Sequence, residues 1–252
     1  MATVQSGPGG IYMFEDFLGA EVPVALTTHF ENLGQFEVTG LNIDNAAAGL
    51  PLLTSSGNNG VGRLTTFTTE QDSIFVNTGI IFDVGDMGTI VAECRIKSET
   101  ITTQQNYFGF CNVVAYDDTI EDHLIDTSTG TTVIDEITAT HLVGFLRSSE
   151  ITANAEWHAI WKGGTTAQTA TTTAGELGVD MVAGDFQILR LEADNNGTVR
   201  WYIDGVLLKT LEGAISTSAA LAISLAVDTH DSAKAEMDVD YILIKANRDW
   251  TV

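Results

Sequence analysis

The sequence predicts an all-β protein that folds as a two-sheet antiparallel β-sandwich. Short runs that alternate apolar and polar residues recur along the chain, and clusters of Gly, Asn and Ser separate them. No segment shows the apolar spacing of an amphipathic helix of three turns, and no fixed-period repeat is present. Asp204-Gly205 lies between two runs of β-branched and aromatic residues, which is typical of a tight β-hairpin.

The N-terminal region predicts an arm followed by a single domain. Residues 1–11 are small, polar and rich in Gly and Pro, so we expect a flexible arm before one sandwich domain spanning residues 12–252. Residues 12–18 form the expected opening strand. Between residues 27 and 69, short apolar runs are separated by long loops, as in other all-β proteins.

The middle of the chain supplies closely spaced strands and one long loop. Strands are expected at residues 63–69, 73–82, 89–97, 107–116, 140–148 and 155–162. Ile90, Ala92, Cys94 and Ile96 share one face of their strand, which indicates a half-buried strand. Residues 117–132 are polar and lack a sustained apolar period, so they predict a surface loop, and residues 163–178 predict an extended crossover.

The C-terminal third predicts a three-stranded meander and two further strands. Residues 186–193 alternate and lead through a cluster of turn formers into the hairpin of residues 199–210. Trp201 and its alternate neighbours share one face of the hairpin. Residues 219–227 predict a buried strand, and residues 239–244 predict the closing strand.

The composition limits the classes of partner. The 252-residue chain has 11 Lys and Arg residues against 34 Asp and Glu residues, a net charge of −23. Such a surface repels phosphate backbones and anionic membranes, so we expect neither nucleic-acid nor membrane binding. No apolar run reaches the roughly 18 residues of a membrane span. The first residues lack the cationic and apolar regions of a secretory signal, so no signal peptide is expected.

The two cysteines allow two interpretations. If residues 89–97 and 107–116 pair as neighbouring strands, the sulfurs of Cys94 and Cys111 could lie nearly opposite each other. The alternative, which we favour, is that both are small buried residues with free thiols.

Two stretches resemble known families. The Trp-Tyr-Ile-Asp-Gly-Val hairpin at residues 201–206, followed by the closing strand, resembles concanavalin A-like lectin/glucanase jelly rolls, which include laminin-G-like modules and laminarinase-type glucanases. This resemblance implies a jelly roll whose opening strand lies beside its last one. Residues 9–19 are similar to the openings of structural proteins of tailed-phage particles.

The glucanase resemblance implies a catalytic strand of the form Glu-x-Asp-x-x-Glu or Glu-x-Asp-x-Glu, in which two carboxyl groups face one glycosidic bond. The near match is Glu236, Asp238 and Asp240. The third acid of this near match is Asp, where the family pattern has Glu. The near match also lies in the closing strand, whereas the catalytic strand of the family precedes the hairpin. Asp135 and Glu136 are adjacent and therefore point to opposite faces. We therefore expect no catalytic residues. The acids of residues 236–240 are expected on the outward face of the closing strand, and the inward face is expected to carry Met237, Val239, Tyr241 and Leu243.

The sequence offers candidate residues for a sugar site and for a metal site. Trp157, Trp161 and Trp201 could be stacking platforms for a sugar, but each lies at a core-facing position, so we favour burial and assign no carbohydrate-binding residue. The acids of residues 117–126 and 228–231 lack the spacing of a calcium loop, so no metal or cofactor is expected. The Asn-Gly-Thr sequence at residues 196–198 is interpreted as a tight turn.

Taken with the resemblances, these features predict a non-enzymatic virion structural protein that decorates or cements the capsid of a tailed phage, on its outer surface. The expected partners are the major capsid protein and further copies of the chain, with a trimer as the first choice, and the contact residues are unassigned. A carbohydrate-binding, lectin-like adhesin that binds a surface glycan is the alternative, and a laminarinase-type glycoside hydrolase is less favoured.

Overall fold

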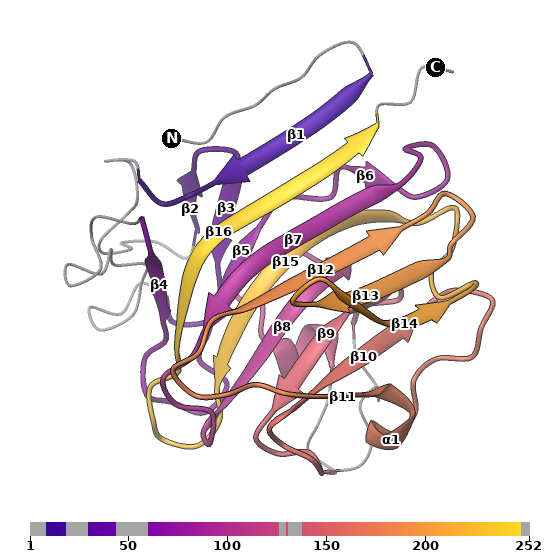
Figure 1. Cartoon of the computed structure of the whole chain (residues 1–252). Helices are drawn as coiled ribbons and strands as arrows, with labels where there is room; N and C mark the ends of the chain where they lie inside the picture. Colours follow the sequence, from indigo (N-terminus) through magenta and orange to yellow (C-terminus); the bar gives the residue numbers. More distant parts are fainter. Residues whose placement is uncertain (1–8, 19–29, 44–59, 126–129, 131–137, 248–252) are drawn as a thin grey trace.

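Two antiparallel sheets form the predicted sandwich (Figure 1). The computed structural model describes residues 9–18, 30–43, 60–125, 130 and 138–247. The seven-stranded front sheet contains, in spatial order, β1 (Gly10–Glu15), β16 (Glu236–Asn247), β7 (Ile90–Lys97), β12 (Gln187–Ala193), β13 (Val199–Ile203) and β14 (Val206–Leu211), and β4 (Gly62–Thr65) also pairs with β16. Residues 1–8 of the predicted arm lie outside the described residues.

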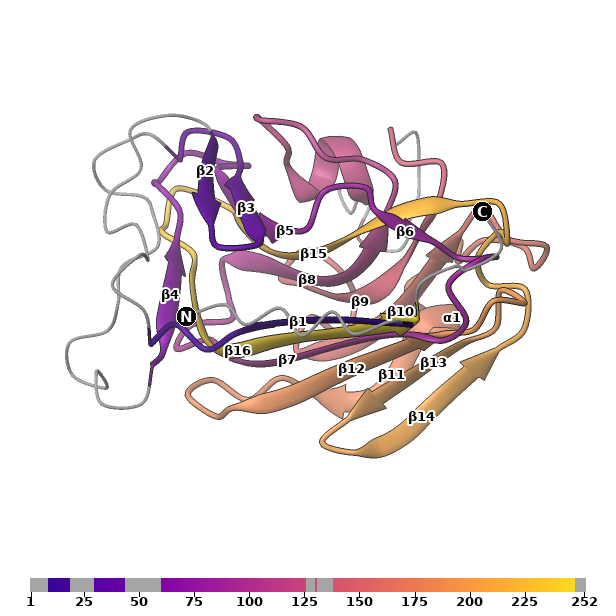
Figure 2. The same cartoon turned by 90° about the horizontal axis from the view of Figure 1, so that it is seen from above.

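The nine-stranded back sheet lies behind the front sheet (Figure 2). It contains, in spatial order, β11 (Glu176–Asp180), β10 (Glu156–Lys162), β9 (Leu142–Ser148), β8 (Gln104–Cys111), β15 (Ala220–Thr229), β5 (Ser73–Asn77), β3 (Phe36–Thr39) and β2 (Phe30–Leu33), and β6 (Phe82–Asp83) pairs with β15. The helical elements of the described residues are a single π-helical turn, η1 (Ile120–Leu124), and a short helix, α1 (Thr172–Gly175). None of the helices described is long and apolar enough to cross a membrane.

The core fills the space between the sheets. The inner face of β7 carries the predicted row of Ile90, Ala92, Cys94 and Ile96, each almost fully buried. It packs in one cluster with side chains of the back sheet such as Phe108. Removing this apolar surface from water is the main favourable contribution to folding.

The predicted meander of β12, β13 and β14 is confirmed. Asp204 and Gly205 have φ values of 49° and 78°, so both occupy the left-handed region that a type I′ turn requires. The Asp204 carboxylate also accepts the backbone N–H of Ile188 at 2.9 Å, which fixes the turn to β12. The opening strand lies beside the last one, as the resemblance implies, with Phe14 opposite Leu243.

The structure decides between the two interpretations of the cysteines and corrects two other expectations. β7 and β8 belong to different sheets, so the pairing considered for Cys94 and Cys111 does not occur, and the favoured interpretation of two buried residues with free thiols is confirmed. The predicted surface loop at residues 117–132 instead contains η1, with Ile120 and Leu124 buried. The second correction concerns β16, whose register against β7 shifts between Val239 and Tyr241, so that Tyr241 and Leu243 lie on the outer face and not inward. The Tyr241 hydroxyl donates to Glu93 there.

Candidate functional site

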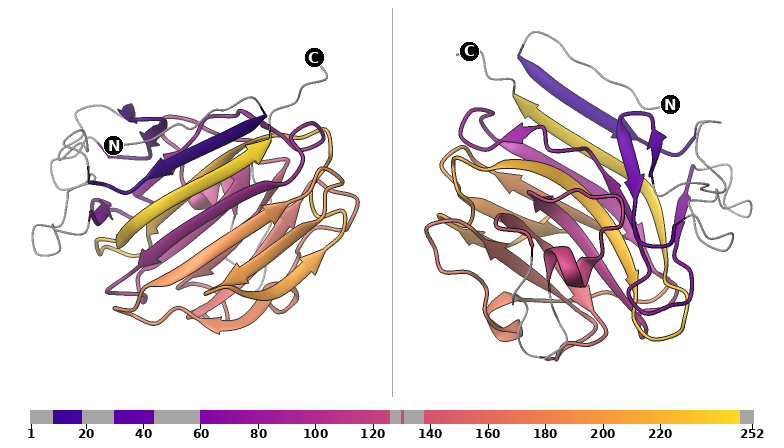
Figure 3. Two further views of the ribbon diagram at one scale, coloured as in Figure 1. Left: turned by 45° about the horizontal axis from the view of Figure 1, so that its top comes forward. Right: turned by 180° about the vertical axis from the view of Figure 1, so that it is seen from behind.

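The outer faces of the two sheets differ in what covers them. Residues 112–125, which we call the covering segment, lie across the outer face of the back sheet (Figure 3). Ile120 and Leu124 are fully buried there, in a second apolar cluster with Tyr107, Leu146 and Ile160. Within the described ranges, no helix or strand packs on the outer face of the front sheet (Figure 1). Among the residues that the structure describes, the front sheet therefore has the less covered outer face.

Side chains on the outer face of the front sheet form a network of ion pairs, which we call the charged face. Its paired cations are Arg63, Arg95, Lys97, Arg190 and Arg200. Lys245 lies on the same face over the Tyr12 ring, so the charged face holds six of the chain's 11 Lys and Arg residues. The Arg190 Nη2 atom lies 2.6 Å from Glu192 Oε1, and its Nη1 atom lies 3.4 Å from Glu93 Oε2. Arg200 Nη2 lies 2.6 Å from Asp194 Oδ2. Side chains that the sequence scatters over five strands are thereby held in one ordered layer.

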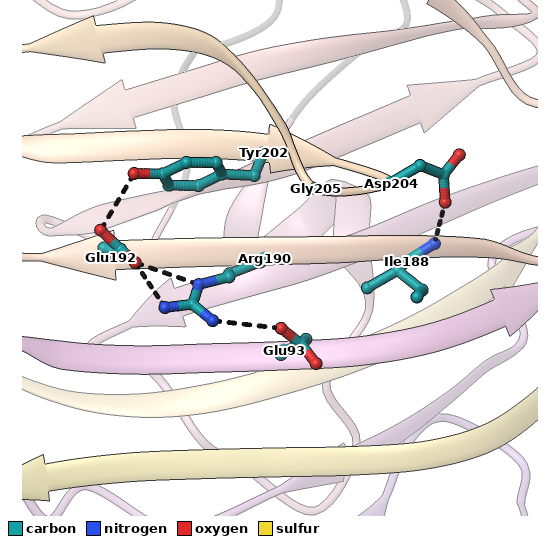
Figure 4. Close-up of a pocket in the computed structure, with 7 residues that line it drawn as sticks. All are labelled: Glu93, Ile188, Arg190, Glu192, Tyr202, Asp204 and Gly205. Atoms are coloured by element: carbon teal, nitrogen blue, oxygen red, sulfur yellow. Dashed lines mark hydrogen bonds and ion pairs between the residues drawn. The ribbon is translucent and has the colours of Figure 1, made fainter.

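A hollow of about 380 Å³ opens on the charged face (Figure 4). Its lining residues are Glu93, Ile188, Arg190, Glu192, Tyr202, Asp204 and Gly205. The hydroxyl of Tyr202 donates to Glu192 Oε2 at 3.1 Å. Loss of hydration and this hydrogen bond raise the pKa of Tyr202, so its hydroxyl stays protonated. Glu93 and Glu192 pair with the Arg190 guanidinium, whereas Asp204 lies beside Ile188, and the hollow suits a polar or cationic group with an apolar stem.

The acids of the near-match strand are all engaged by cations. Asp238 is buried, and its carboxylate accepts from Arg63 Nε at 2.6 Å and lies 3.2 Å from Lys97 Nζ. Arg63 also pairs with Glu236 at 3.2 Å. Asp240 lies at the bulge and pairs with Arg95 at 2.6 Å (Oδ2 to Nη1). This arrangement ties β4, β7 and β16 together. The other acids considered, Asp135 and Glu136, lie outside the described residues.

The three candidate tryptophans are buried, as the alternating pattern predicts. Trp157 and Trp201 are inaccessible to solvent, and Trp161 is 6% exposed. Their indole N–H groups donate to Gln187 Oε1, the Gly144 carbonyl and the Ala167 carbonyl at 2.9, 2.8 and 2.7 Å respectively. These rings therefore stabilise the core and present no stacking surface.

The remaining candidates are the possible metal ligands and the Asn-Gly-Thr sequence at residues 196–198. In the part of the chain that the structure describes, no group of three or more His, Cys, Asp or Glu side chains could hold a metal ion. Asp126 lies outside that part. Asn196 accepts the backbone N–H of Thr198 at 3.0 Å, and Gly197 has a φ of 81°, which confirms the predicted tight turn.

Sequence reasoning missed a cluster of polar side chains beneath the covering segment. We call Gln71, Gln105, Glu121, Glu150 and His230 the carboxyl cluster. Gln105 Nε2 donates to Glu121 Oε1 at 2.7 Å and to Glu150 Oε2 at 3.0 Å, so a single amide joins two acids. The acids of residues 117–126 were visible in the sequence, but only the fold brings Glu150 and His230 to them.

Comparisons with known proteins show the fold. No family model matches the chain, and no curated protein matches it. A protein of unknown function from Shewanella oneidensis MR-1 is similar, with a TM-score of 0.58 and 14% identity over 99% of this chain and 92% of that one. Bacillus licheniformis β-glucanase has a TM-score of 0.54 and 11% identity over 95% of this chain and 99% of that one. The carbohydrate recognition domain of Emp46p has a TM-score of 0.55 and 13% identity over 84% of this chain and 88% of that one. The chain therefore has the concanavalin A-like jelly-roll fold that glucanases and lectin domains share.

Proposed function

We propose that this chain is a non-enzymatic structural protein of a virus particle, which decorates the capsid of a tailed phage and binds the shell through the charged face. The single observation that carries the proposal is the contrast between the two outer faces. The covering segment packs on the back sheet, whereas the front sheet presents an open, ordered layer of arginine and aromatic side chains. Arginine and aromatic residues are enriched in protein–protein interfaces.

The charged face is already ordered before any partner binds. The Arg95 guanidinium lies 4.2 Å from the centre of the Phe186 ring, and Lys245 Nζ lies 5.5 Å from that of Tyr12. Cation–π contacts of this kind hold both the cationic side chain and the aromatic ring in place. Because these side chains are already held, binding costs less conformational entropy than it does for free surface side chains. This order favours a surface for stable binding.

The proposed mechanism is stabilisation by mass action. A protein that contacts neighbouring shell subunits together buries its surface only when those subunits are assembled, so its binding free energy is added to the assembled state. The proposed partner is the major capsid protein, and copies of the chain on a symmetric shell would associate as closed oligomers, with a trimer as the first choice.

The ion pairs of Glu236, Asp238 and Asp240 support a role without catalysis. A glycosidase needs two carboxyl groups that face one bond, one to protonate the leaving group and one to act as nucleophile or base. Here these carboxylates face arginine and lysine side chains of neighbouring strands. The glucanase alternative fits the structural neighbours as well as the lectin alternative does, so release of reducing sugar from laminarin by the purified chain would overturn the proposal.

The decisive experiment is to measure the copy number of the chain in purified virus particles from its source by quantitative mass spectrometry, with the major capsid protein as the internal standard. A ratio near the copy number of the shell supports decoration. A few copies per particle would point to a fibre or receptor-binding part, and absence from the particles would overturn the virion proposal.

A binding assay then tests the charged face. Shells that lack the chain are mixed with the purified protein, and bound protein is measured after sedimentation. Arg95→Ala should weaken binding about tenfold, because it removes both the ion pair to Asp240 and the contact with Phe186. Lys162→Ala, which changes a cation of the back sheet, is the matched control and should bind like the unaltered chain. Equal loss in both variants would contradict binding through this face.

The hollow favours a sugar-binding adhesin as the second candidate. Tyr202 and three carboxylates line it, and an aromatic ring beside hydrogen-bonding groups suits a sugar. The test is a glycan array with the unaltered chain and with Tyr202→Ala. Binding that the substitution abolishes would support this alternative, whereas no bound glycan, or binding that persists in the variant, would contradict a sugar site in the hollow.

A further inference from the structure

We propose that the carboxyl cluster is a pH-sensitive latch, which holds the covering segment on the back sheet at acidic pH and releases it as the pH rises. The latch would control access to the apolar outer face of the back sheet. It is independent of the charged face, so it can be tested whatever the chain binds there.

The geometry joins the covering segment to separate parts of the chain through Glu121. This residue lies in η1, where its Oε1 atom accepts from Gln105 of β8 at 2.7 Å. Its Oε2 atom accepts from Gln71, in the turn before β5, at 2.8 Å. The side chain of one residue therefore attaches η1 both to β8 and to the turn before β5.

Glu150 completes the cluster from the turn after β9. Its Oε2 atom accepts from the same Gln105 amide at 3.0 Å, and its Oε1 atom lies 2.9 Å from His230 Nδ1, just beyond β15. Two carboxyl groups on different elements thus share one amide donor. The attachment depends on how many protons the two acids hold, because two carboxylates repel each other while a carboxyl and a carboxylate can share a proton.

Further acids face η1 and its N-terminal end. Asp228 of β15 is buried, and its Oδ2 atom accepts the backbone N–H of Ile120, while its Oδ1 atom is buried without a hydrogen-bond partner among the described residues. Asp118 precedes η1, and its Oδ1 atom lies 3.6 Å from Nδ1 of His123. Asp122 and His123 are the other titratable groups on η1 itself.

The direction of the pH effect follows from these surroundings. Burial, together with a hydrogen bond and the charge from Glu150, raises the pKa of Glu121 to about 7 from its ordinary value of 4.5. Burial also raises the pKa values of Asp228 and Asp118. An acid whose pKa is higher while the covering segment is docked binds its proton more tightly in the docked state than in the released state. Docking is therefore favoured fully below pH 4.5 and is lost progressively as the pH rises through about 7.

Release of the segment would expose a thiol, which provides the readout. Cys111 lies in the apolar cluster under the covering segment, whereas Cys94 lies in the core between the sheets. In a Cys94→Ala background, Cys111 is the single thiol of the chain. Its rate of reaction with 4,4′-dithiodipyridine then reports how often the covering segment opens.

The experiment compares this background with the same chain carrying Glu121→Gln, which is neutral at every pH. Both proteins are labelled at each pH, so the intrinsic pH dependence of the thiol cancels in the ratio of their rates. A shift from 4.5 to about 7 allows at most about 300-fold in the opening equilibrium, and solvent screening reduces this. We expect the protein that retains Glu121 to be labelled about tenfold faster than the Glu121→Gln variant at pH 8.5, and at the same rate as the variant at pH 5.

Two further variants make the test specific. Glu150→Gln should reproduce the effect of Glu121→Gln, because it removes the other acid of the pair. Asp122→Asn changes an exposed acid on the same turn and should leave the rates unaltered. A ratio that does not change with pH, or an equal effect of Asp122→Asn, would overturn the latch. If neither glutamine variant folds, hydrogen exchange of residues 112–125 in the unaltered chain, corrected with an unstructured peptide, must rise relative to β7 between pH 5 and pH 8.5, and equal protection would refute the proposal.

Discussion

The indole N–H of Trp201 donates to the backbone carbonyl of Gly144 at 2.8 Å, and so joins β13 of the front sheet directly to β9 of the back sheet. Gly144 is also closely packed within its own sheet: a Cβ atom there would lie 2.7 Å from the Phe108 carbonyl oxygen and 2.9 Å from the Tyr107 ring, both on the neighbouring strand β8. The hydrogen bond from Trp201 therefore fixes the local separation of the two layers, and the glycine allows the close approach of β8 and β9.

Trp201→Phe should destabilise the protein by about 2 kcal/mol, because it leaves a void and a buried carbonyl without its donor. The measurement is urea-induced unfolding followed by circular dichroism. Tyr202→Phe, on the outer face of the same strand, removes a hydrogen bond to the partly exposed Glu192 and should cost less than about 1 kcal/mol. A larger effect at Tyr202 than at Trp201 would refute this account of the core.

Gly144→Ala should cost about 1–3 kcal/mol, because the added methyl group meets backbone atoms of β8 that have no room to move. Thermal unfolding would show this as a lowered midpoint. Gly10→Ala, where a Cβ atom meets nothing within 4 Å, is the control and should leave the midpoint unchanged or slightly raised. Equal behaviour of the two variants would mean that β8 and β9 adjust easily at Gly144.

Gly205→Ala should destabilise the hairpin by about 1 kcal/mol, because its φ of 78° strains any residue that carries a Cβ atom. A Cβ atom at this position meets nothing within 4 Å, so the backbone alone is responsible. Unfolding in urea would measure the loss. Asp204→Asn, which tolerates the left-handed region, should be nearly neutral, and a neutral Gly205→Ala would contradict the type I′ turn.

Asp238→Asn should cost about 2–3 kcal/mol, because it leaves Arg63 and Lys97 without the buried carboxylate that pairs with both. Asp240→Asn breaks the pair with Arg95, whose side chain is 37% exposed, and should cost less than about 1 kcal/mol. Denaturant unfolding of both variants side by side gives the comparison. If the two losses are equal, burial does not decide the strength of these pairs.

Neither thiol should react quickly in the folded protein at pH 5, where the covering segment is docked. Burial raises the pKa of Cys111 to about 11 and that of Cys94 well above its ordinary value, so little thiolate forms at either residue. Mass spectrometry after brief reaction with 4,4′-dithiodipyridine should therefore find an unlabelled chain, whereas the same reaction in 6 M guanidinium should label both residues. Cys111 should be modified before Cys94 during long exposure, and the reverse order would contradict the positions assigned to them.

Local patterns predicted much of the fold. The alternation of β7, the Asp204-Gly205 turn and the inward tryptophans follow from a period of two and from turn chemistry, which depend on residues close together in the sequence. The position of β1 beside β16 followed from resemblance, since no local pattern specifies a pairing between the first and last strands.

The errors and the open alternatives arose where distant residues decide the structure. The bulge near Asp240 places Tyr241 outside, and nothing in the alternation of β16 reveals it. Cys94 and Cys111 lie on successive strands that belong to different sheets, a choice that depends on the whole topology. The carboxyl cluster was missed for the same reason, because Glu121 and Glu150 become neighbours only through Gln105.

The position of β7 has a consequence for how the chain folds during synthesis. Both of its neighbours, β12 and β16, come later in the sequence, and β16 ends at Asn247. While the ribosome is still translating, the inner face of β7 is apolar and its edges lack their partners, a condition that exposes a nascent chain to aggregation. The front sheet is therefore completed only after β16 has emerged, and slower elongation between β12 and β16 would prolong the exposure of this strand to chaperones.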